Sequence, residues 1–309
     1  MTTLVLGGHG MLGSALVRNL QSQNIKTVAH KRSDCDLTDY WETYDYIKTI
    51  NPRTIYHAAG RVGGILANMT KQYDFLFDNL SMASNVIDSA RAHNIHNFFY
   101  ISSSCVYPAN CKQPMQEHMI YDGYPEITNR GYALAKIVGM EMIKDTRLVF
   151  DWNYRTMIPC NLYGPNDDFS VNGHVLGSLI RKICDAKRNG LHDITIWGDG
   201  TARREFLHVD DCASAILYAS RMMTRDDKSD TINIGSGKDI SIMELAKLIR
   251  QIVDWDGAIL CDTTKPTGMT QKLLDISYLN GVGWESNVSL SDGIKELVKE
   301  YNASPITQE

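Results

Sequence analysis

A tyrosine and a lysine stand four residues apart, at Tyr132 and Lys136, in a stretch predicted to be helical. Side chains at this spacing project from the same face of a helix. A nearby ammonium stabilises tyrosinate, so we expect it to lower the pKa of the phenol from its usual value of about 10. Such a tyrosine can donate and accept protons near neutral pH. The same spacing occurs by chance in many helices, so the pair alone is weak evidence.

Upstream of this pair, a predicted buried strand leads into Ser102-Ser103-Ser104-Cys105. A serine at the carboxyl end of such a strand can hydrogen-bond a substrate carbonyl while the tyrosine moves its proton. Cys105 can act as a general acid or base when its pKa is tuned. A buried structural thiol is the competing interpretation for any single cysteine.

A glycine-rich loop near the N-terminus is predicted to bind a dinucleotide. It lies between a predicted strand at 3–7 and a predicted helix at 11–21, and its spacing suits a tight turn whose backbone approaches a pyrophosphate at the helix N-terminus. An ordinary glycine turn is the alternative, which the strand–loop–helix context disfavours. The loop reads Gly7-Gly8-His9-Gly10-Met11-Leu12-Gly13.

The charged residues that follow the second predicted strand, 27–29, favour NADPH/NADP+ over NAD as the cofactor. An NAD enzyme usually has an acidic residue at this point, whereas this chain has Lys31 and Arg32. A positive pair would attract a 2′-phosphate, although it also fits a solvated surface. Asp36 and Leu37, just beyond, are placed to meet the adenine.

The elements predicted around these residues define an α/β fold. Strands at 27–29, 54–58 and 97–102 alternate with helices at 41–50 and 78–92, a pattern typical of a Rossmann-type doubly wound parallel sheet that binds ligands at the carboxyl ends of its strands. Loops at 161–173 and 198–203 and shorter helices at 174–188, 241–254 and 290–302 then indicate a smaller C-terminal α/β substrate lobe. We therefore predict a cofactor-binding domain at 1–160 and a substrate lobe at 161–309, with about 204–230 returning to the first domain.

The composition excludes several classes of protein. A net charge of −5 argues against a nucleic-acid-binding surface, and no apolar run approaches the roughly 20 residues that span a membrane. The N-terminal residues do not resemble a signal peptide. The seven cysteines include no CxxC pair, so we expect reduced thiols in the cytoplasm and no metal site.

Taken together, the glycine loop, serine, tyrosine and lysine resemble the extended short-chain dehydrogenase/reductase family over essentially the whole chain. The segments 57–60, 159–165 and 204–211 and residue Asn79 carry further motifs of that family. The resemblance implies that Ser103, Tyr132 and Lys136 are catalytic. His9 departs from it, because bacterial members often have there an arginine that helps to bind the 2′-phosphate. The implied cofactor contacts are Gly7, His9, Gly10, Met11, Leu12, Gly13, Lys31, Arg32, Asp36, Leu37, Ala58, Ala59, Tyr132, Lys136, Pro159, Asn161, Leu162 and His174.

Within that family, the chain resembles the GDP-L-fucose synthase branch. Sugar-nucleotide dehydratases have an Asp-Glu pair after the serine, whereas this chain has Ser104 and Cys105 and so lacks the dehydration machinery. The segments 62–68, 104–108, 112–115, 174–176, 265–268 and 272–275 carry the closer resemblance.

That branch epimerises C3 and C5 of GDP-4-keto-6-deoxy-D-mannose and then reduces C4 with NADPH. The resemblance implies that Cys105 and His174 form the acid/base pair, although a histidine after Gly173 also fits a helix cap. The 4-keto group acidifies the hydrogens at C3 and C5, and Ser103 and Tyr132 can stabilise the resulting enolate. Tyr132 then supplies the proton at C4.

The expected substrate contacts lie in the second lobe. Arg204 is the best diphosphate ligand, because a guanidinium binds phosphate oxygens bidentately. Lys182, Trp197 and Lys265 occupy positions that match the branch and would hold phosphate, guanine or ribose, while Asn161 would orient the sugar.

Two departures leave the exact sugar open. Arg203 adds a positive charge beside Arg204, and the loop 269–271 differs from the usual one, so a related GDP-4-keto sugar such as a GDP-heptose is the alternative substrate. A non-catalytic nucleotide sensor is disfavoured, because such proteins commonly lose the Tyr-Lys pair. The resemblance also implies a homodimer formed through two helices of the first domain, one of which contains Tyr132.

Overall fold

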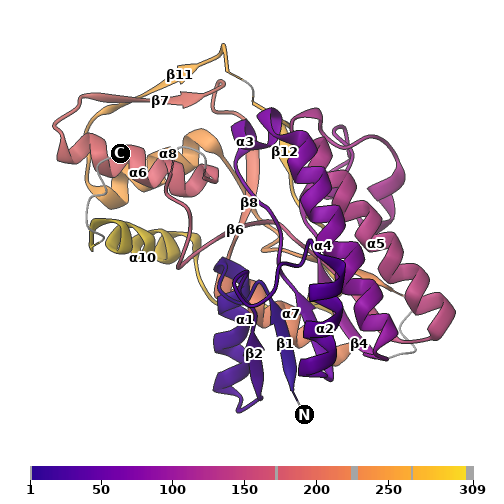
Figure 1. The fold of residues 1–309 in the computed structure, drawn as a ribbon. Coiled ribbons are helices and arrows are strands. Elements are labelled where there is room, and N and C mark those ends of the chain that lie inside the picture. Colours follow the sequence, from indigo (N-terminus) through magenta and orange to yellow (C-terminus); the bar gives the residue numbers. More distant parts are fainter. Residues whose placement is uncertain (1, 171–172, 224–228, 266, 304–309) are drawn as a thin grey trace.

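A parallel sheet of six strands forms the centre of the larger lobe in the computed structural model, which describes residues 2–170, 173–223, 229–265 and 267–303 (Figure 1). The strand order is β2-β1-β3-β4-β5-β9, and every neighbouring pair is parallel. All four residues of β1 are buried, as expected for a strand with helices on both faces. The strands are β1 (Thr3–Leu6), β2 (Thr27–Ala29), β3 (Thr54–His57), β4 (Asn97–Ile101), β5 (Asn153–Pro159) and β9 (Thr231–Ile234).

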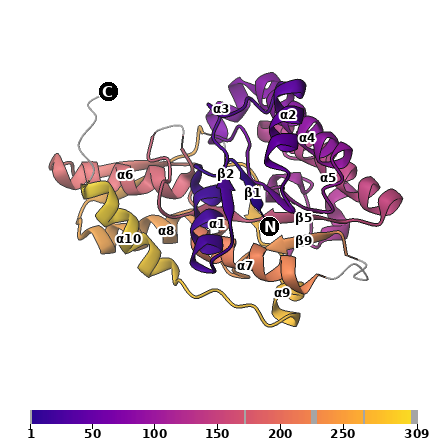
Figure 2. The ribbon, with the colours of Figure 1, turned by 60° about the horizontal axis from the view of Figure 1, so that its bottom comes forward.

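Helices cover both faces of this sheet (Figure 2). The chain steps from β1 outwards to β2 and then back past β1 to β3, and right-handed connections in opposite directions place their helices on opposite faces. One face carries α1 (Met11–Ser22) and α7 (Val209–Met222), and the other carries α2 (Tyr40–Ile50), α4 (Gln72–Ala92) and α5 (Arg130–Phe150). The strand order reverses beside β1, and ligands bind at such a point in doubly wound sheets.

The start of α4 differs from the sequence-based expectation. The helix begins at Gln72 rather than near Asp78. Tyr73 and Phe77 in its first turns are exposed apolar side chains, 73% and 54% accessible, so this stretch lacks the apolar-to-polar periodicity that identifies an amphipathic helix.

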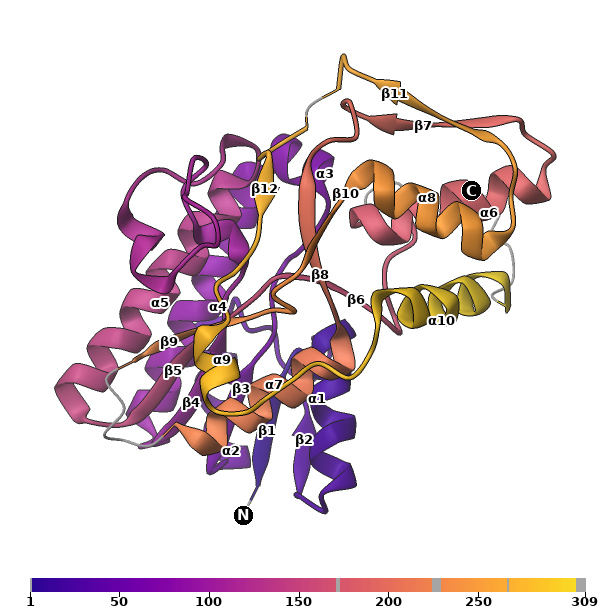
Figure 3. The ribbon, with the colours of Figure 1, turned by 180° about the vertical axis from the view of Figure 1, so that it is seen from behind.

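The smaller lobe has its own sheets and its own core (Figure 3). In one sheet β8 (Arg203–His208) pairs with β10 (Asp239–Ser241), β12 (Gln271–Lys272) and β6 (Asn161–Tyr163). A second sheet pairs β7 (Asp193–Trp197) with β11 (Ala258–Asp262). Helices α6 (Val175–Arg188), α8 (Ile242–Val253) and α10 (Leu290–Ala303) pack into the core. The short elements are α3 (Ile65–Thr70), α9 (Ser277–Gly281), η1 (Ser104–Val106), η2 (Glu117–Tyr121) and η3 (Ile127–Asn129).

The chain crosses between the lobes more than once. Strand β8 belongs to the smaller lobe, whereas α7 packs on α1 and β9 adds the sixth strand to the main sheet. The stretch 161–173 was expected to be a loop, but it contains β6, which pairs with β8. The domain boundary at residue 160 stays a prediction. The smaller core begins at Tyr163, but the main core also includes Ile232, Ile234 and residues between Met269 and Trp284, so the two lobes do not divide at one point of the chain.

Candidate active site

A cleft of about 710 Å³ lies where the main sheet meets the smaller lobe. Its walls include the residues that directly follow β3 and β4, the N-terminal turn of α1, and side chains from α5, α6, β7, β8 and β12. All five predicted catalytic residues line it: Ser103, Cys105, Tyr132, Lys136 and His174.

Ser103 and Cys105 lie just beyond the carboxyl end of β4. Ser103 is the N-cap of η1, and its Oγ accepts a hydrogen bond from the backbone nitrogen of Cys105 at 3.3 Å. Ser103 is also hydrogen-bonded to the hydroxyl of Tyr132. The single turn of η1 therefore fixes the hydroxyl and the thiol at one end of the cleft.

Tyr132 and Lys136 project from α5 towards the same end. The Nζ of Lys136 donates to the carbonyl oxygen of Ile101 at 2.8 Å and lies 5.8 Å from the centre of the Tyr132 ring. Gly139 allows α5 to approach β4, because a Cβ there would lie 2.5 Å from the hydroxyl oxygen of Tyr100.

The expected lowering of the Tyr132 pKa was wrong. Burial raises the pKa of the phenol above its usual value, and Cys105 raises it further, while the hydrogen bond with Ser103 lowers it only in part. Burial also lowers the pKa of Lys136 to about 7. Desolvation disfavours both charged forms, so it raises the pKa of the phenol and lowers that of the ammonium. The phenol therefore carries its proton at neutral pH, which is the state a proton donor needs.

His174 occupies the N-cap position of α6, but its side chain makes no capping hydrogen bond. The structure therefore gives no support to a capping role for the imidazole. The ring is accessible from the cleft, and the protein around it lowers the pKa of the imidazole, an effect that Asp168 partly offsets.

The glycine loop has the backbone that a dinucleotide requires. Gly7 has a φ of +74°, and a Cβ on Gly13 would lie 1.9 Å from the carbonyl oxygen of Gly7. Gly10 is the N-cap of α1 without a side-chain cap, so the first amides of the helix are left for an anion. The cleft is lined by Gly10, Met11, Leu12, Gly13, Ala58, Ala59, Pro159, Asn161 and Leu162.

The residues predicted to meet the adenosine half lie outside the lining of this cleft. Lys31 and Arg32 are exposed, and Arg32 forms an ion pair with Asp36 at 3.1 Å. Leu37 is buried in the main core, and its carbonyl oxygen accepts a hydrogen bond from the amide of Asn85. Gly7 and His9 are also absent from the cleft lining.

Four of the five predicted substrate contacts line the cleft. Asn161 donates to the carbonyl oxygen of Glu205 at 2.9 Å, Lys182 to that of Thr195 at 3.0 Å, and Arg204 to that of Thr267 at 3.1 Å. These bonds orient the side chains, and Trp197 completes the set. Lys265 is exposed and does not line the cleft.

The additional positive charge of Arg203 takes part in ion pairs within the smaller lobe. Its guanidinium pairs with Asp239 at 2.9 Å and with Glu244 at 3.4 Å. Met269, from the loop that departs from the usual sequence, is buried and lines the cleft.

Two further residues at the thiol were not predicted. The Nδ2 of Asn129 lies 3.1 Å from the Sγ of Cys105, and the Nζ of Lys272 lies 3.7 Å from the same sulfur. Asn129 stands three residues before Tyr132, and Lys272 begins the segment 272–275 that carries part of the resemblance. Their places in the sequence could have drawn attention to Asn129 and Lys272, but neither place indicates a contact with a cysteine.

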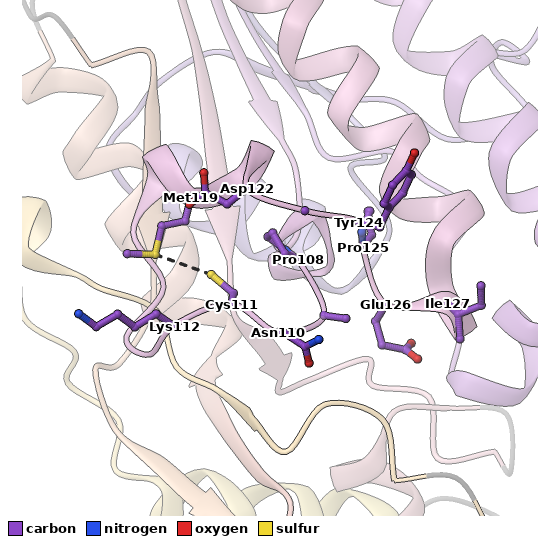
Figure 4. Close-up of a pocket in the computed structure, with 12 residues that line it drawn as sticks. Pro108, Asn110, Cys111, Lys112, Met119, Asp122, Tyr124, Pro125, Glu126 and Ile127 are labelled. Carbon is purple, nitrogen blue, oxygen red and sulfur yellow. Dashed lines mark hydrogen bonds between the residues drawn. The ribbon is translucent and has the colours of Figure 1, made fainter.

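A second hollow, of about 680 Å³, lies between the chain segments around 108–112 and 119–127 (Figure 4). It contains none of the predicted catalytic residues, and it shares Glu126 with the cleft. Cys111 contacts the sulfur of Met119 at 3.7 Å, and Asn110 and Lys112 line the same hollow.

The described ranges contain no group of three metal-ligating side chains. Within the same ranges, no helix is both long enough and apolar enough to cross a membrane.

The fold and the cleft define a class: a Rossmann-type oxidoreductase whose cleft is lined by Ser103, Tyr132 and Lys136. Residues 3–235 match the NAD dependent epimerase/dehydratase family, and the chain belongs to that family.

Individual relatives narrow the comparison. The chain is 39% identical over 299 residues to GDP-L-fucose synthase 1 of Arabidopsis thaliana, which covers 96% of this chain and 92% of the relative. It is similar to the solved structure of a GDP-L-fucose synthetase from Naegleria fowleri bound to NADP, with 25% identity and a TM-score of 0.86 over 98% of this chain and 95% of that one. It is also similar to a GDP-6-OMe-4-keto-L-xylo-heptose reductase from C. jejuni, with 29% identity and a TM-score of 0.89 over 97% of each chain.

Proposed function

We propose that this chain catalyses the GDP-L-fucose synthase reaction: it epimerises C3 and C5 of GDP-4-keto-6-deoxy-D-mannose and then reduces C4 with NADPH to give GDP-L-fucose. The observation that carries this function is that Cys105 and His174 share one cleft with Ser103, Tyr132 and Lys136. Reduction alone needs only the last three residues. The thiol and the imidazole add the two proton-transfer groups that an epimerisation requires.

In the epimerisation, Cys105 and His174 exchange protons with the carbons next to the ketone. Removal of the hydrogen from C3 or C5 moves its bonding electrons onto the carbonyl oxygen and gives an enolate. The hydroxyl groups of Ser103 and Tyr132 donate hydrogen bonds to that oxygen. Return of a proton to the opposite face of the carbon inverts the centre.

In the reduction, Tyr132 is the proton donor to the C4 oxygen. Bound NADPH supplies the hydride. Because burial keeps the phenol protonated at neutral pH, the tyrosine is ready to give its proton as charge develops on that oxygen. Lys136, which is anchored on Ile101, holds its amino group beside the tyrosine.

The residues of the glycine loop fit NADP(H). The pyrophosphate would bind at Gly13 and the uncapped N-terminus of α1, where the backbone amides can donate to its oxygens. The exposed Lys31 and Arg32 would attract the 2′-phosphate. On the other side of the cleft, Arg204 and Lys182 would hold the diphosphate of the GDP-sugar, and Trp197 would contact its nucleoside.

Product analysis tests this function. Purified protein is incubated with GDP-4-keto-6-deoxymannose and either NADPH or NADH, and the nucleotide sugars are separated and identified. We expect GDP-L-fucose together with oxidation of NADPH, and slower turnover with NADH. If neither GDP-fucose nor NADPH oxidation is seen, the proposed substrate is wrong.

Deuterium exchange tests the assigned residues. Cys105→Ser should stop solvent exchange into C3 and C5 far more than it slows reduction of a 4-keto sugar that needs no epimerisation. Undiminished exchange would exclude Cys105 from the proton transfers.

A GDP-4-keto-heptose is the second candidate substrate. The similarity to the heptose reductase and the position of Met269 in the cleft favour it. NADPH oxidation with the heptose but not with the deoxyhexose would select this alternative.

We also propose a homodimer built on α4 and α5, and a cytoplasmic location. The two helices pack side by side on the side of the molecule away from α6, α8 and α10 (Figure 1), and Tyr73 and Phe77 expose apolar rings on α4. The seven cysteines are all free, which fits a reducing compartment.

A further inference from the structure

The sulfur of Cys105 is contacted by two donor groups that come from opposite lobes. Asn129 reaches it from η3, directly before α5, with its Nδ2 at 3.1 Å. Lys272 reaches it from β12 with its Nζ at 3.7 Å. An ammonium can only donate, and the amide presents its donor nitrogen, so the sulfur is the acceptor in both contacts.

The use of Asn129 is unusual for its position. It is the N-cap of α5, and asparagine is favoured there because its side-chain oxygen accepts a helix amide. This asparagine makes no such cap, and its Oδ1 is buried without a hydrogen-bond partner among the described residues. A buried acceptor without a partner is destabilising. The Asn129 side chain does not cap α5, and its nitrogen contacts the sulfur of Cys105 instead.

Lys272 is held in place by the sheet of the smaller lobe. Its strand pairs in parallel with β8, where Lys272 lies opposite Arg204. The side chain is buried, and the segment after it is fixed because the Leu274 amide donates to Glu205 at 2.9 Å. The ammonium therefore has a defined position beside the thiol.

The charges that face the sulfur are predominantly positive. Lys272 is in contact with it, and Arg204 interacts with it electrostatically. Glu126 acts on Arg204, and the protonated Tyr132 lies beside the thiol. Cationic neighbours attract negative charge on the sulfur, so they favour its role as a hydrogen-bond acceptor.

We infer that Asn129 and Lys272 are positioning residues for Cys105: together they hold its sulfur in place as a hydrogen-bond acceptor in the cleft. The inference rests on the proposed function, which gives Cys105 its acid/base role. It assigns to the smaller lobe a part in the proton chemistry as well as in holding the nucleotide sugar.

The test uses alkylation of the thiol, which requires no sugar substrate. The thiolate attacks the methylene carbon of iodoacetamide, a carbon–sulfur bond forms, and iodide leaves. Peptide mass spectrometry measures the rate at Cys105 in the full-length protein near pH 7. The exposed Cys261 in the same molecule provides the reference rate.

We expect Lys272→Met to lower the alkylation rate of Cys105, relative to Cys261, by about tenfold, because the attacking sulfur loses a contact with a charged donor, and such hydrogen bonds contribute about 1.5–3 kcal/mol. Lys272→Arg should restore most of the rate. Asn129→Asp has the same shape but places an acceptor or a negative charge beside the sulfur, and it should lower the rate by at least as much.

Matched controls come from the second hollow (Figure 4). Lys112→Met and Asn110→Asp make the same chemical changes at residues that line that hollow and not the cleft, so they should leave the relative rate unchanged. An unchanged relative rate in Lys272→Met and Asn129→Asp would overturn the inference, as would a loss that Lys272→Arg fails to restore. Either result would leave the product assay, and with it the proposed function, unaffected.

Discussion

At the scale of single residues, burial controls the reactive groups of the cleft. The Lys136 amino group is buried and bonded to the Ile101 carbonyl, and Tyr132 is half-buried beside it. Desolvation opposes charge on both, so the tyrosine stays protonated and the lysine titrates near neutrality. The pair is thus prepared for donation of a proton, which is the direction that a reduction requires.

The lysine should make the stability of the cofactor-free protein depend on pH. Its pKa is about 7 in the folded protein and about 10.4 in an unfolded chain. Between these values the unfolded chain binds the additional proton, so the free energy of unfolding rises with pH, by at most about 1.4 kcal/mol per pH unit. Below about pH 7 both states are protonated and the contribution is constant.

Lys136→Met should remove this rise. The measurement is thermal unfolding of the cofactor-free protein between pH 7 and pH 9, where the melting temperature of the wild type should increase more steeply than that of the variant. Lys112→Met, at an exposed lysine, should keep the wild-type slope. Equal slopes in wild type and Lys136→Met would show that Lys136 is charged in the folded protein.

At the scale of elements, the contact between the glycine loop and α1 shapes the proposed cofactor site. Gly13 in the first turn of α1 packs against the backbone of Gly7, and any side chain there would have to displace that backbone. The helix N-terminus can approach a pyrophosphate only while this packing is kept.

Gly13→Ala should therefore weaken NADPH binding by about tenfold or more, because displacing the loop removes hydrogen bonds to a charged phosphate that contribute about 1.5–3 kcal/mol each. Titration of cofactor fluorescence measures the effect. Gly281→Ala is the matched control, since a Cβ there meets nothing within 4 Å. Wild-type affinity in Gly13→Ala would place the pyrophosphate elsewhere.

At the scale of the whole molecule, the reactive cleft belongs to neither lobe alone. The main sheet contributes the loop after β4, α5 comes from the same lobe, and α6, β7, β8 and β12 come from the other. No residue of α4 lines this cleft and α5 contributes only Tyr132 and Lys136 to it, so association through the outer surfaces of these helices would leave the cleft open.

We expect the protein to have a molar mass twice its chain mass of 34.7 kDa in size-exclusion chromatography with light scattering. Tyr73→Glu combined with Phe77→Glu should give a monomer, because burying two unpaired carboxylates in an interface is costly. Leu260→Glu, at an exposed apolar residue of β11, should leave the mass unchanged. A wild-type monomer, or a double variant that stays dimeric, would contradict the proposed interface.

The sequence determined the order of the main elements and the types of the reactive residues. Periodicity located α1, α2 and the first four parallel strands, β1 to β4, within a few residues, because an amphipathic helix and a buried strand leave local patterns. It did not identify β5 and β9, the other two strands of the parallel sheet. The spacing of Tyr132 and Lys136 and the glycine loop are local features as well. Exposed apolar residues concealed the start of α4, and the edge pairing that makes 161–163 a strand depends on β8, which lies far along the chain.

Only the tertiary structure decided the environment of those residues. The pKa of Tyr132 depends on desolvation by segments that are distant in the sequence, and this reversed the expected direction. Arg203 forms an ion pair with Asp239, and Lys265 lies outside the cleft. The positions of these two side chains depend on the pairing of strands and on the path of a loop. The contact of Lys272 with Cys105 joins residues from two lobes, and no local pattern records such a distance.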